Sequence, residues 1–212
     1  HKELGHAAIY LGMKNSGHTF NDVVAKYGSL DSALLDSFLV KHESGLSILC
    51  SSEMYIQGTK HFDAKSVQRA VDFLKEQYDY IIFDGHPASP DSDAVAGNAG
   101  KVYMVVSAEV ASLRDLNRYI DHFGKDPAKF HVVVTNEGKS AVTASHVSST
   151  CGLPVVARFS QVDEAVASAT NAGRTISRDV KNFHEPLSDI LSEIDPTAVV
   201  ETPKKSLFGW RK

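Results

Sequence analysis

Cysteine and long apolar runs are both scarce in this chain of 212 residues. Its two cysteines, Cys50 and Cys151, lie far apart and show no metal-ligand spacing, so we expect reduced thiols, with a disulfide as the less favoured alternative. No stretch approaches the roughly 18 consecutive apolar residues that predict a membrane-spanning helix. Residues 1–5 have neither the basic start nor the apolar core of a secretory signal. These absences predict a cytoplasmic protein.

An excess of charge of one sign is also missing. The net charge is −4 and 23% of the residues are charged, which gives no indication of nucleic-acid binding. Hydrophobic residues make up 42% of the chain, enough for a sizeable core. The length fits one domain with an appendage. We expect a folded domain over residues 1–195, followed by a linker and a basic tail over residues 196–212.

Five short apolar runs are separated by segments of helical periodicity. The runs cover residues 47–50, 80–83, 102–106, 131–134 and 155–159. They are continuous rather than alternating, which is typical of strands buried on both faces of a parallel sheet. We therefore expect all five strands in one mainly parallel sheet.

The segments between these runs carry apolar residues at three- and four-residue spacing. This spacing predicts helices around residues 67–74, 113–120, 162–169 and 187–194. Asp31 or Ser32 is a candidate N-cap for a further short helix that carries Leu35 and Phe38. Strands that alternate with helices imply right-handed crossovers. The predicted fold class is α/β, a doubly wound, mainly parallel sheet with helices on both faces.

The most suggestive candidate for chemistry is Asp84, which follows the apolar run 80–83 and precedes Gly85. An apolar strand that ends in Asp has the form of a Walker B strand, in which the acid orients Mg²⁺ through water. The alternative is an acid that only solvates or caps the strand end. His86, beside Asp84 and near Asp91, could bind a metal, but a loop histidine beside a turn is the more common arrangement.

Several short motifs follow one another along the chain. Asp79-Tyr80 opens the apolar run before Asp84, and Ser112-Leu113-Arg114 opens a helix after the next strand. Further segments are 5–12, 36–46, 152–157, 166–173 and the basic, aromatic end 204–212. In this order, over nearly the whole chain, they resemble the CpaE/TadZ pilus-assembly group of ParA/MinD-like ATPases. The resemblance implies the fold of P-loop NTPases of the MinD type.

Three departures from that family pattern stand out. No Gly-x-Gly-Lys element that could cradle phosphates occurs, and the sequence begins near the end of the family's second strand. Pro87 comes three residues after Asp84 rather than two, and residues 159–162 lack the Pro and the acid of the family's adenine-side loop. We expect either a portion of a longer protein or a domain that has lost its ATP machinery.

The resemblance also implies ligands and partners. Asp84 would hold Mg²⁺ indirectly, only with nucleotide, and Asn136 would read adenine, unless Asn136 is a turn residue before Gly138. We expect no cofactor for this chain alone, and ATP with Mg²⁺ in an intact bacterial parent. Pilus or secretion assembly proteins are the expected partners. Loss of the family's first strand should leave a sheet edge, covered in a homodimer or by another element.

The sequence and the resemblance together leave three alternative functions. The first is an incomplete or non-catalytic ParA/MinD-like domain that acts through protein contacts in localising a pilus or secretion system. The second is a portion of an active ATPase whose phosphate loop lies upstream. The third is an unrelated α/β enzyme that uses Asp84 and His86. Residues 204–212 could in addition touch an anionic inner-membrane surface weakly, although a solvated tail is the preferred interpretation.

The tail provides a first prediction. Deleting residues 204–212 should leave the melting temperature within a few degrees, because changes in solvated segments cost less than about 0.5 kcal/mol. Thermal unfolding followed by circular dichroism measures this. A large loss of stability would show that Phe208 and Trp210 pack into the core.

Overall fold

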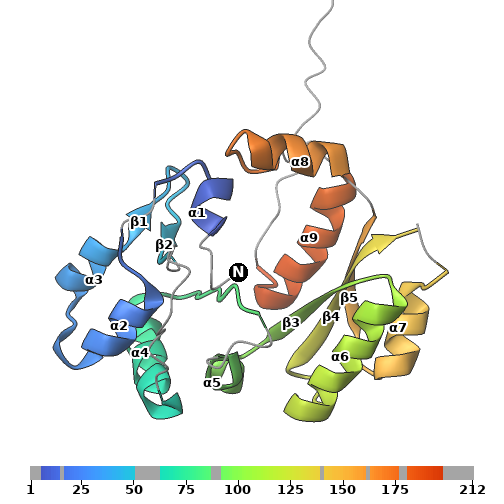
Figure 1. Cartoon of the computed structure of the whole chain (residues 1–212), viewed down its shortest axis with the longest axis horizontal. Coiled ribbons are helices and arrows are strands. Elements are labelled where there is room, and N and C mark those ends of the chain that lie inside the picture. Colours follow the sequence, from blue (N-terminus) through green and yellow to red (C-terminus); the bar gives the residue numbers. More distant parts are fainter. Residues whose placement is uncertain are drawn as a thin grey trace, which may run out of the picture. The chain divides into compact units, whose positions relative to one another are not determined.

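A computed structural model describes residues 6–14, 17–50, 63–86, 92–138, 141–160, 163–176 and 181–197 (Figure 1). The chain divides into two compact units. The first combines His1–Gly100 with Ser168–Thr175, and the second combines Lys101–Ala167 with Ile176–Lys212. The expected tail, 204–212, lies outside the described residues.

The second unit is built on a parallel sheet. Its strands are β3 (Val102–Ser107), β4 (Phe130–Glu137) and β5 (Val155–Ser160), in the order β3-β4-β5. β3 and β4 pair without interruption from Val102 opposite Phe130 to Ser107 opposite Thr135. β5 pairs with β4 in parallel, and the register shifts between Val132 and Val133 and again between Val134 and Glu137. These strands coincide with three of the predicted apolar runs.

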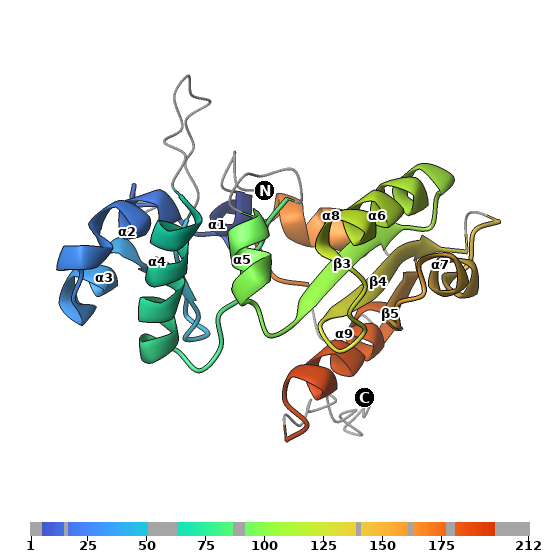
Figure 2. The same cartoon turned by 90° about the horizontal axis from the view of Figure 1, so that it is seen from below.

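Helices cover both faces of this sheet (Figures 1 and 2). α6 (Val110–Phe123) and α7 (Ala144–Cys151) pack on one face, where Leu116 and Val147 join Val132 and Val134 in the core. α9 (Lys181–Ile194) lies on the other face, and the Phe183 ring contacts the Phe159 ring at 5.2 Å. The predicted fold class, an α/β parallel sheet with helices on both faces, is confirmed.

The first unit is mainly helical. Its elements are α1 (His6–Tyr10), α2 (Phe20–Lys26), the 3-10 turn η1 (Tyr27–Ser29), α3 (Ser32–Phe38), β1 (Val40–Lys41), β2 (Ser47–Ile48), α4 (Ala64–Gln77) and α5 (Ser92–Asn98). α2, α3 and α4 share one core, in which Val24, Leu35, Phe38 and Val67 are buried. α8 (Asp163–Asn171) begins in the second unit and ends in the first.

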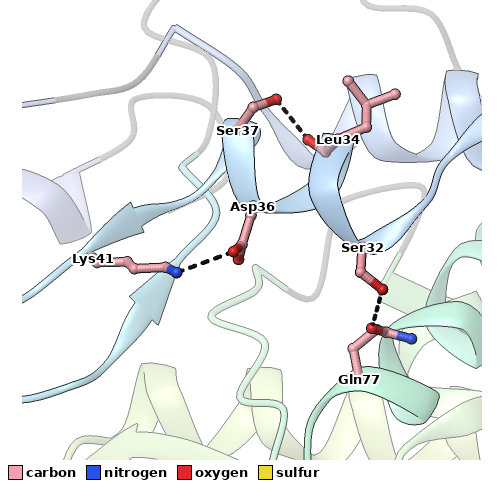
Figure 3. Close-up of polar contacts among 6 residues, drawn as sticks. All are labelled: Ser32, Leu34, Asp36, Ser37, Lys41 and Gln77. Carbon is pink, nitrogen blue, oxygen red and sulfur yellow. Dashed lines mark hydrogen bonds and ion pairs between the residues drawn. The ribbon is translucent and has the colours of Figure 1, made fainter.

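Acidic side chains start two helices of this unit. Asp31 accepts the Leu34 N–H at 2.7 Å, which confirms it as the N-cap of α3. Asp63 caps α4 by accepting the hydroxyl and the backbone N–H of Ser66, and these hydrogen bonds lower the pKa of Asp63. The first turn of α3 and the end of α4 are joined where Ser32 Oγ donates to Gln77 Oε1 at 2.7 Å (Figure 3).

Two predicted strands take other positions. Ile48 pairs antiparallel with Val40 in a two-residue ladder outside the parallel sheet, because the short turn at His42–Gly45 allows a hairpin. Residues 80–83 have no helix or strand assignment and pair with no other described strand. Their apolar sequence favours burial, yet Tyr80 and Ile82 are 60% and 86% exposed. An apolar run indicates a preference for burial but does not supply a neighbouring strand.

Some helices gave only weak signals in the sequence. α7 contains three serines and one threonine among eight residues, which obscures its apolar periodicity. Its ends are clear in the structure: Thr143 accepts the His146 N–H, and Gly152 takes the left-handed conformation at the C-terminal end. Of the helices described, none has the length and apolar character needed to cross a membrane.

Leu116 tests the packing of α6 on the sheet. It is 1% exposed, so Leu116→Ala should lower the free energy of unfolding by about 2–5 kcal/mol through lost burial and a cavity. Val110 in the same helix is 74% exposed and gives a matched control, since Val110→Ala should change stability by no more than about 0.5 kcal/mol. Urea unfolding measures both. Equal effects of the two substitutions would contradict the described packing.

Candidate functional site

The carboxyl ends of β3 and β4 bring together polar groups from two strands. In open parallel sheets, ligands bind beyond this edge. Ser107 ends β3 and Asn136 lies near the end of β4, where Asn136 Nδ2 donates to Ser107 Oγ at 3.2 Å. The Ser107 hydroxyl in turn donates to Glu109 Oε1 at 3.2 Å, so three side chains form one hydrogen-bonded row.

Asn136 has an unusual backbone. Its φ of 56° lies in the left-handed region, and it is the only described residue other than glycine with a positive φ. Asparagine tolerates this conformation better than most residues because its short amide can bond locally. The bond to Ser107 holds the carboxamide in place, while the residue stays exposed. The structure therefore places Asn136 at the sheet edge as a fixed, solvent-facing amide.

Carboxylates flank this amide on both sides. Glu109 precedes α6 and accepts from Ser107, while Glu137 Oε1 accepts the Ala144 N–H at the start of α7 at 2.9 Å. The sequence analysis did not select Ser107, Glu109 or Glu137. Ser107 and Glu109 could have been found, because they follow directly on the apolar run 102–106 and parallel strands end at the same edge.

Asp84 belongs to the first unit, whereas Asn136 belongs to the second. Asp84 is exposed and directly follows residues 80–83. The next residue but one, His86, is also exposed, and its carbonyl oxygen accepts the Ser92 hydroxyl at 2.6 Å. Asp91, the third member of the predicted metal alternative, lies outside the described residues. Within the described part of the chain, no group of three His, Cys, Asp or Glu side chains could hold a metal ion.

Among the residues that the structure describes, those named above do not supply the contacts that ATP with Mg²⁺ needs. Binding a triphosphate requires several backbone N–H groups and a cation aimed at the phosphates. The sequence contains no Gly-x-Gly-Lys element to provide them. Asp84 offers one carboxylate, and Glu109 and Glu137 add negative charge beside Asn136, which disfavours an anionic ligand at this edge.

A second polar cluster lies at the amino ends of β3 and β4, beneath α9. The Tyr103 and His131 rings stack at 5.6 Å, and Lys101 Nζ lies 3.8 Å from Glu193 Oε2. Burial raises the pKa of the Tyr103 phenol, and the Glu193 carboxylate adds to this effect. His131 Nδ1 is buried without a hydrogen-bond partner. The cluster holds α9 on the sheet at the end remote from the carboxyl edge.

No family model matches this sequence, and no curated protein matches it. Solved structures do match the fold. A ParA family ATPase from Chlorobium tepidum TLS superposes with a TM-score of 0.72 at 17% identity, over 86% of this chain and 79% of the other. The MinC:MinD cell division protein complex of Aquifex aeolicus gives 0.68 at 18% identity, over 91% and 79%.

The septum site-determining protein MinD of Pyrococcus horikoshii OT3, complexed with Mg-ADP, gives a TM-score of 0.68 at 15% identity, over 91% of this chain and 79% of the other. These identities are low, so the likeness concerns the fold. The chain has the fold of ParA/MinD-type P-loop ATPases.

Asn136 provides a prediction for this edge. Asn136→Ala loses the bond to Ser107 and places a Cβ residue in the left-handed region, so the free energy of unfolding should fall by about 1–2 kcal/mol. Asn136→Gly loses only this bond, and Ser107→Ala loses it together with the exposed bond to Glu109 but adds no backbone penalty, so each should cost less than about 1 kcal/mol. Urea unfolding of the three variants measures the difference. If Asn136→Ala and Asn136→Gly were equally stable, the left-handed backbone would be refuted.

Proposed function

We propose that this chain is a ParA/MinD-like domain that works through protein contacts rather than ATP turnover, as in the CpaE/TadZ group that localises pilus or secretion machinery. Two observations, taken together, support this proposal most strongly. The fold matches that of ParA/MinD ATPases over most of the chain, while the sequence has no element that could cradle phosphates. A fold can persist as an interaction scaffold after its chemistry is lost, because function depends on the site.

The electrostatics at the sheet edge support the same proposal. In this class, the amides and lysine of the phosphate loop balance the charge of the β- and γ-phosphates. Asp84 would offer Mg²⁺ one carboxylate, and Mg²⁺ keeps most of its water when only one or two carboxylates are offered. Asn136 could contribute one hydrogen bond to an adenine edge, worth about 0.5–1.5 kcal/mol. Micromolar affinity requires a binding free energy of roughly 8 kcal/mol, far more than this one hydrogen bond supplies.

The partner surface in this proposal is a sheet edge. β3 pairs with β4 on one side only among the described strands, and Val105 on β3 is 66% exposed. β3 carries no proline or charged residue over Val102–Ser107, whereas free edges normally carry such protective features. A homodimer or another polypeptide segment would cover it. Pilus or secretion assembly proteins would bind the resulting assembly at the cytoplasmic side of the inner membrane.

A second candidate is a portion of an active ATPase whose phosphate loop lies upstream. Asn136 favours this candidate, because its left-handed backbone and its bond to Ser107 fix an amide where a base could be read. In that intact parent, ATP and Mg²⁺ would control dimerisation, with Asp84 on the metal side and Asn136 on the adenine side.

Isothermal titration calorimetry with Mg-ATP tests whether this chain binds nucleotide by itself. The 212-residue chain at high micromolar concentration should give no heat beyond dilution, because the phosphates find no matching donors. Asp84→Ala serves as the matched control and should behave identically, and far-UV circular dichroism checks that both chains are folded. Stoichiometric binding at micromolar affinity that disappears in Asp84→Ala would overturn the proposal and reveal a phosphate site within this chain.

A further inference from the structure

The parallel sheet of the second unit has two edges among the described strands, and the side chains on these edges differ. β5 forms one edge and carries the exposed Arg158, a charged residue of the kind that discourages pairing with another chain. β3 forms the other edge and contains only uncharged residues over Val102–Ser107. An uncharged edge strand without proline is a template for pairing with a further strand.

The backbone of β3 directs a regular set of hydrogen-bonding groups away from β4. Val102 N donates to Lys129 O at 2.9 Å, and Ala108 N donates to Thr135 O at 2.9 Å. The register between the two strands is uninterrupted, and alternate residues of a parallel strand bond the same neighbour, so the even-numbered residues of β3 bond β4. The residues of β3 that face away from β4 are Tyr103, Val105 and Ser107.

The helix above this part of the sheet covers only the beginning of β3. Tyr103 lies beneath α9, where its ring stacks on the His131 ring and the Glu193 carboxylate is close enough to raise the pKa of the phenol. Val105 follows two residues later on the same face of the sheet and is 66% exposed. The cover therefore ends between these two residues, and an apolar side chain stands uncovered at an unpaired edge.

We propose that β3 of one copy pairs antiparallel with β3 of a second copy about a two-fold axis at Val105, so that two three-stranded sheets join into one. The dimer rests on the proposed function, because it names the partner of the sheet edge described there. A two-fold axis perpendicular to the sheet reverses the strand direction and keeps each face of the sheet on its own side. The pairing therefore adds a neighbour without disturbing the helices that already pack on each face.

The hydrogen-bonding groups of β3 are complementary to themselves in this register. Val105 faces Val105 of the second copy, and each directs its N–H and C=O groups at the other. Tyr103 faces Ser107 of the second copy, and both of these residues also point away from their own β4. The two exposed valine side chains meet on one face of the joined sheet, where each covers apolar surface of the other.

Charge favours the same register. Lys101 faces Glu109 of the second copy; both residues are exposed, and Glu109 continues the extended backbone after β3 with φ −137°. Lys101 Nζ lies 3.8 Å from Glu193 Oε2, and an ammonium group with three donors can bond a second carboxylate. An axis at Met104 would instead place Lys101 opposite Ser107, so that the opposite charges would not meet.

Sedimentation velocity of the 212-residue chain over a range of concentrations tests the dimer. A single pair of strands buries less than the roughly 1,200–2,000 Å² of a stable interface, so the mass should rise from monomer toward dimer as the concentration reaches the high micromolar range. A parent chain that stays monomeric at these concentrations would overturn the dimer. It would leave the proposed function standing, because that proposal is overturned by nucleotide binding in calorimetry.

Substitutions at Val105 show whether this edge carries the association. Val105→Pro removes the outward N–H and leaves the bonds to β4 in place, so the dissociation constant should increase by about tenfold or more. Val105→Thr is the matched control, since it keeps the N–H and the β-branched shape, and should change the constant by less than about threefold. Equal effects of the two substitutions would overturn the proposal.

A third variant keeps the test open if Val105→Pro does not fold, which far-UV circular dichroism checks. Val105→Lys leaves the backbone intact and places two cations opposite each other at the axis, so it should also weaken the dimer by about tenfold. A dimer as stable with Val105→Lys as with Val105→Thr would overturn the pairing at this edge.

Disulfide cross-linking tests the register. Val105→Cys places two thiols across the axis, where the Cα atoms of an antiparallel hydrogen-bonded pair lie about 5.5 Å apart, within the range that a disulfide bridges. Ser107→Cys is the control, because its two copies would lie about 13 Å apart along the strands. Cys50 and Cys151 are buried. After mild oxidation, a covalent dimer should form with Val105→Cys and not with Ser107→Cys; equal cross-linking of both would overturn the register.

Discussion

Strand β4 is buried on both faces, and this double burial constrains every other element of the second unit. Val132 and Val134 pack beneath α6 and α7, while His131 and Val133 are buried on the opposite face. Such a strand needs a neighbour on each edge and a helix on each face, because unpaired peptide groups away from water are costly. β3 and β5 provide the edges, and α6, α7 and α9 provide the faces.

The properties of the candidate site follow from that arrangement. Because the strands are parallel, the ends of β3 and β4 fall at the same edge, and Ser107 and Asn136 meet there. The charges beside these two residues come from Glu109 and Glu137. Negative charge beside Asn136 is poorly matched to a triphosphate.

The sequence predicted the elements whose burial is decided locally and missed those that depend on distant neighbours. The apolar runs at residues 102–106 and 131–134 became β3 and β4, since residues buried on both faces leave a continuous apolar signature. The run at 80–83 has the same signature, yet whether it pairs depends on a strand elsewhere in the chain or outside it. Asn136 was selected through a family resemblance, while its left-handed backbone left no mark in the sequence.

The central claim is that a ParA/MinD-type sheet persists here without a phosphate site. A two-dimensional amide NMR spectrum of the chain, recorded with and without a millimolar excess of Mg-ATP, tests this residue by residue. The account predicts that the amides of Gly85 and Glu137, next to Asp84 and Asn136, keep their positions apart from small, non-saturating shifts. Saturating shifts at both amides with a common micromolar dissociation constant would contradict it.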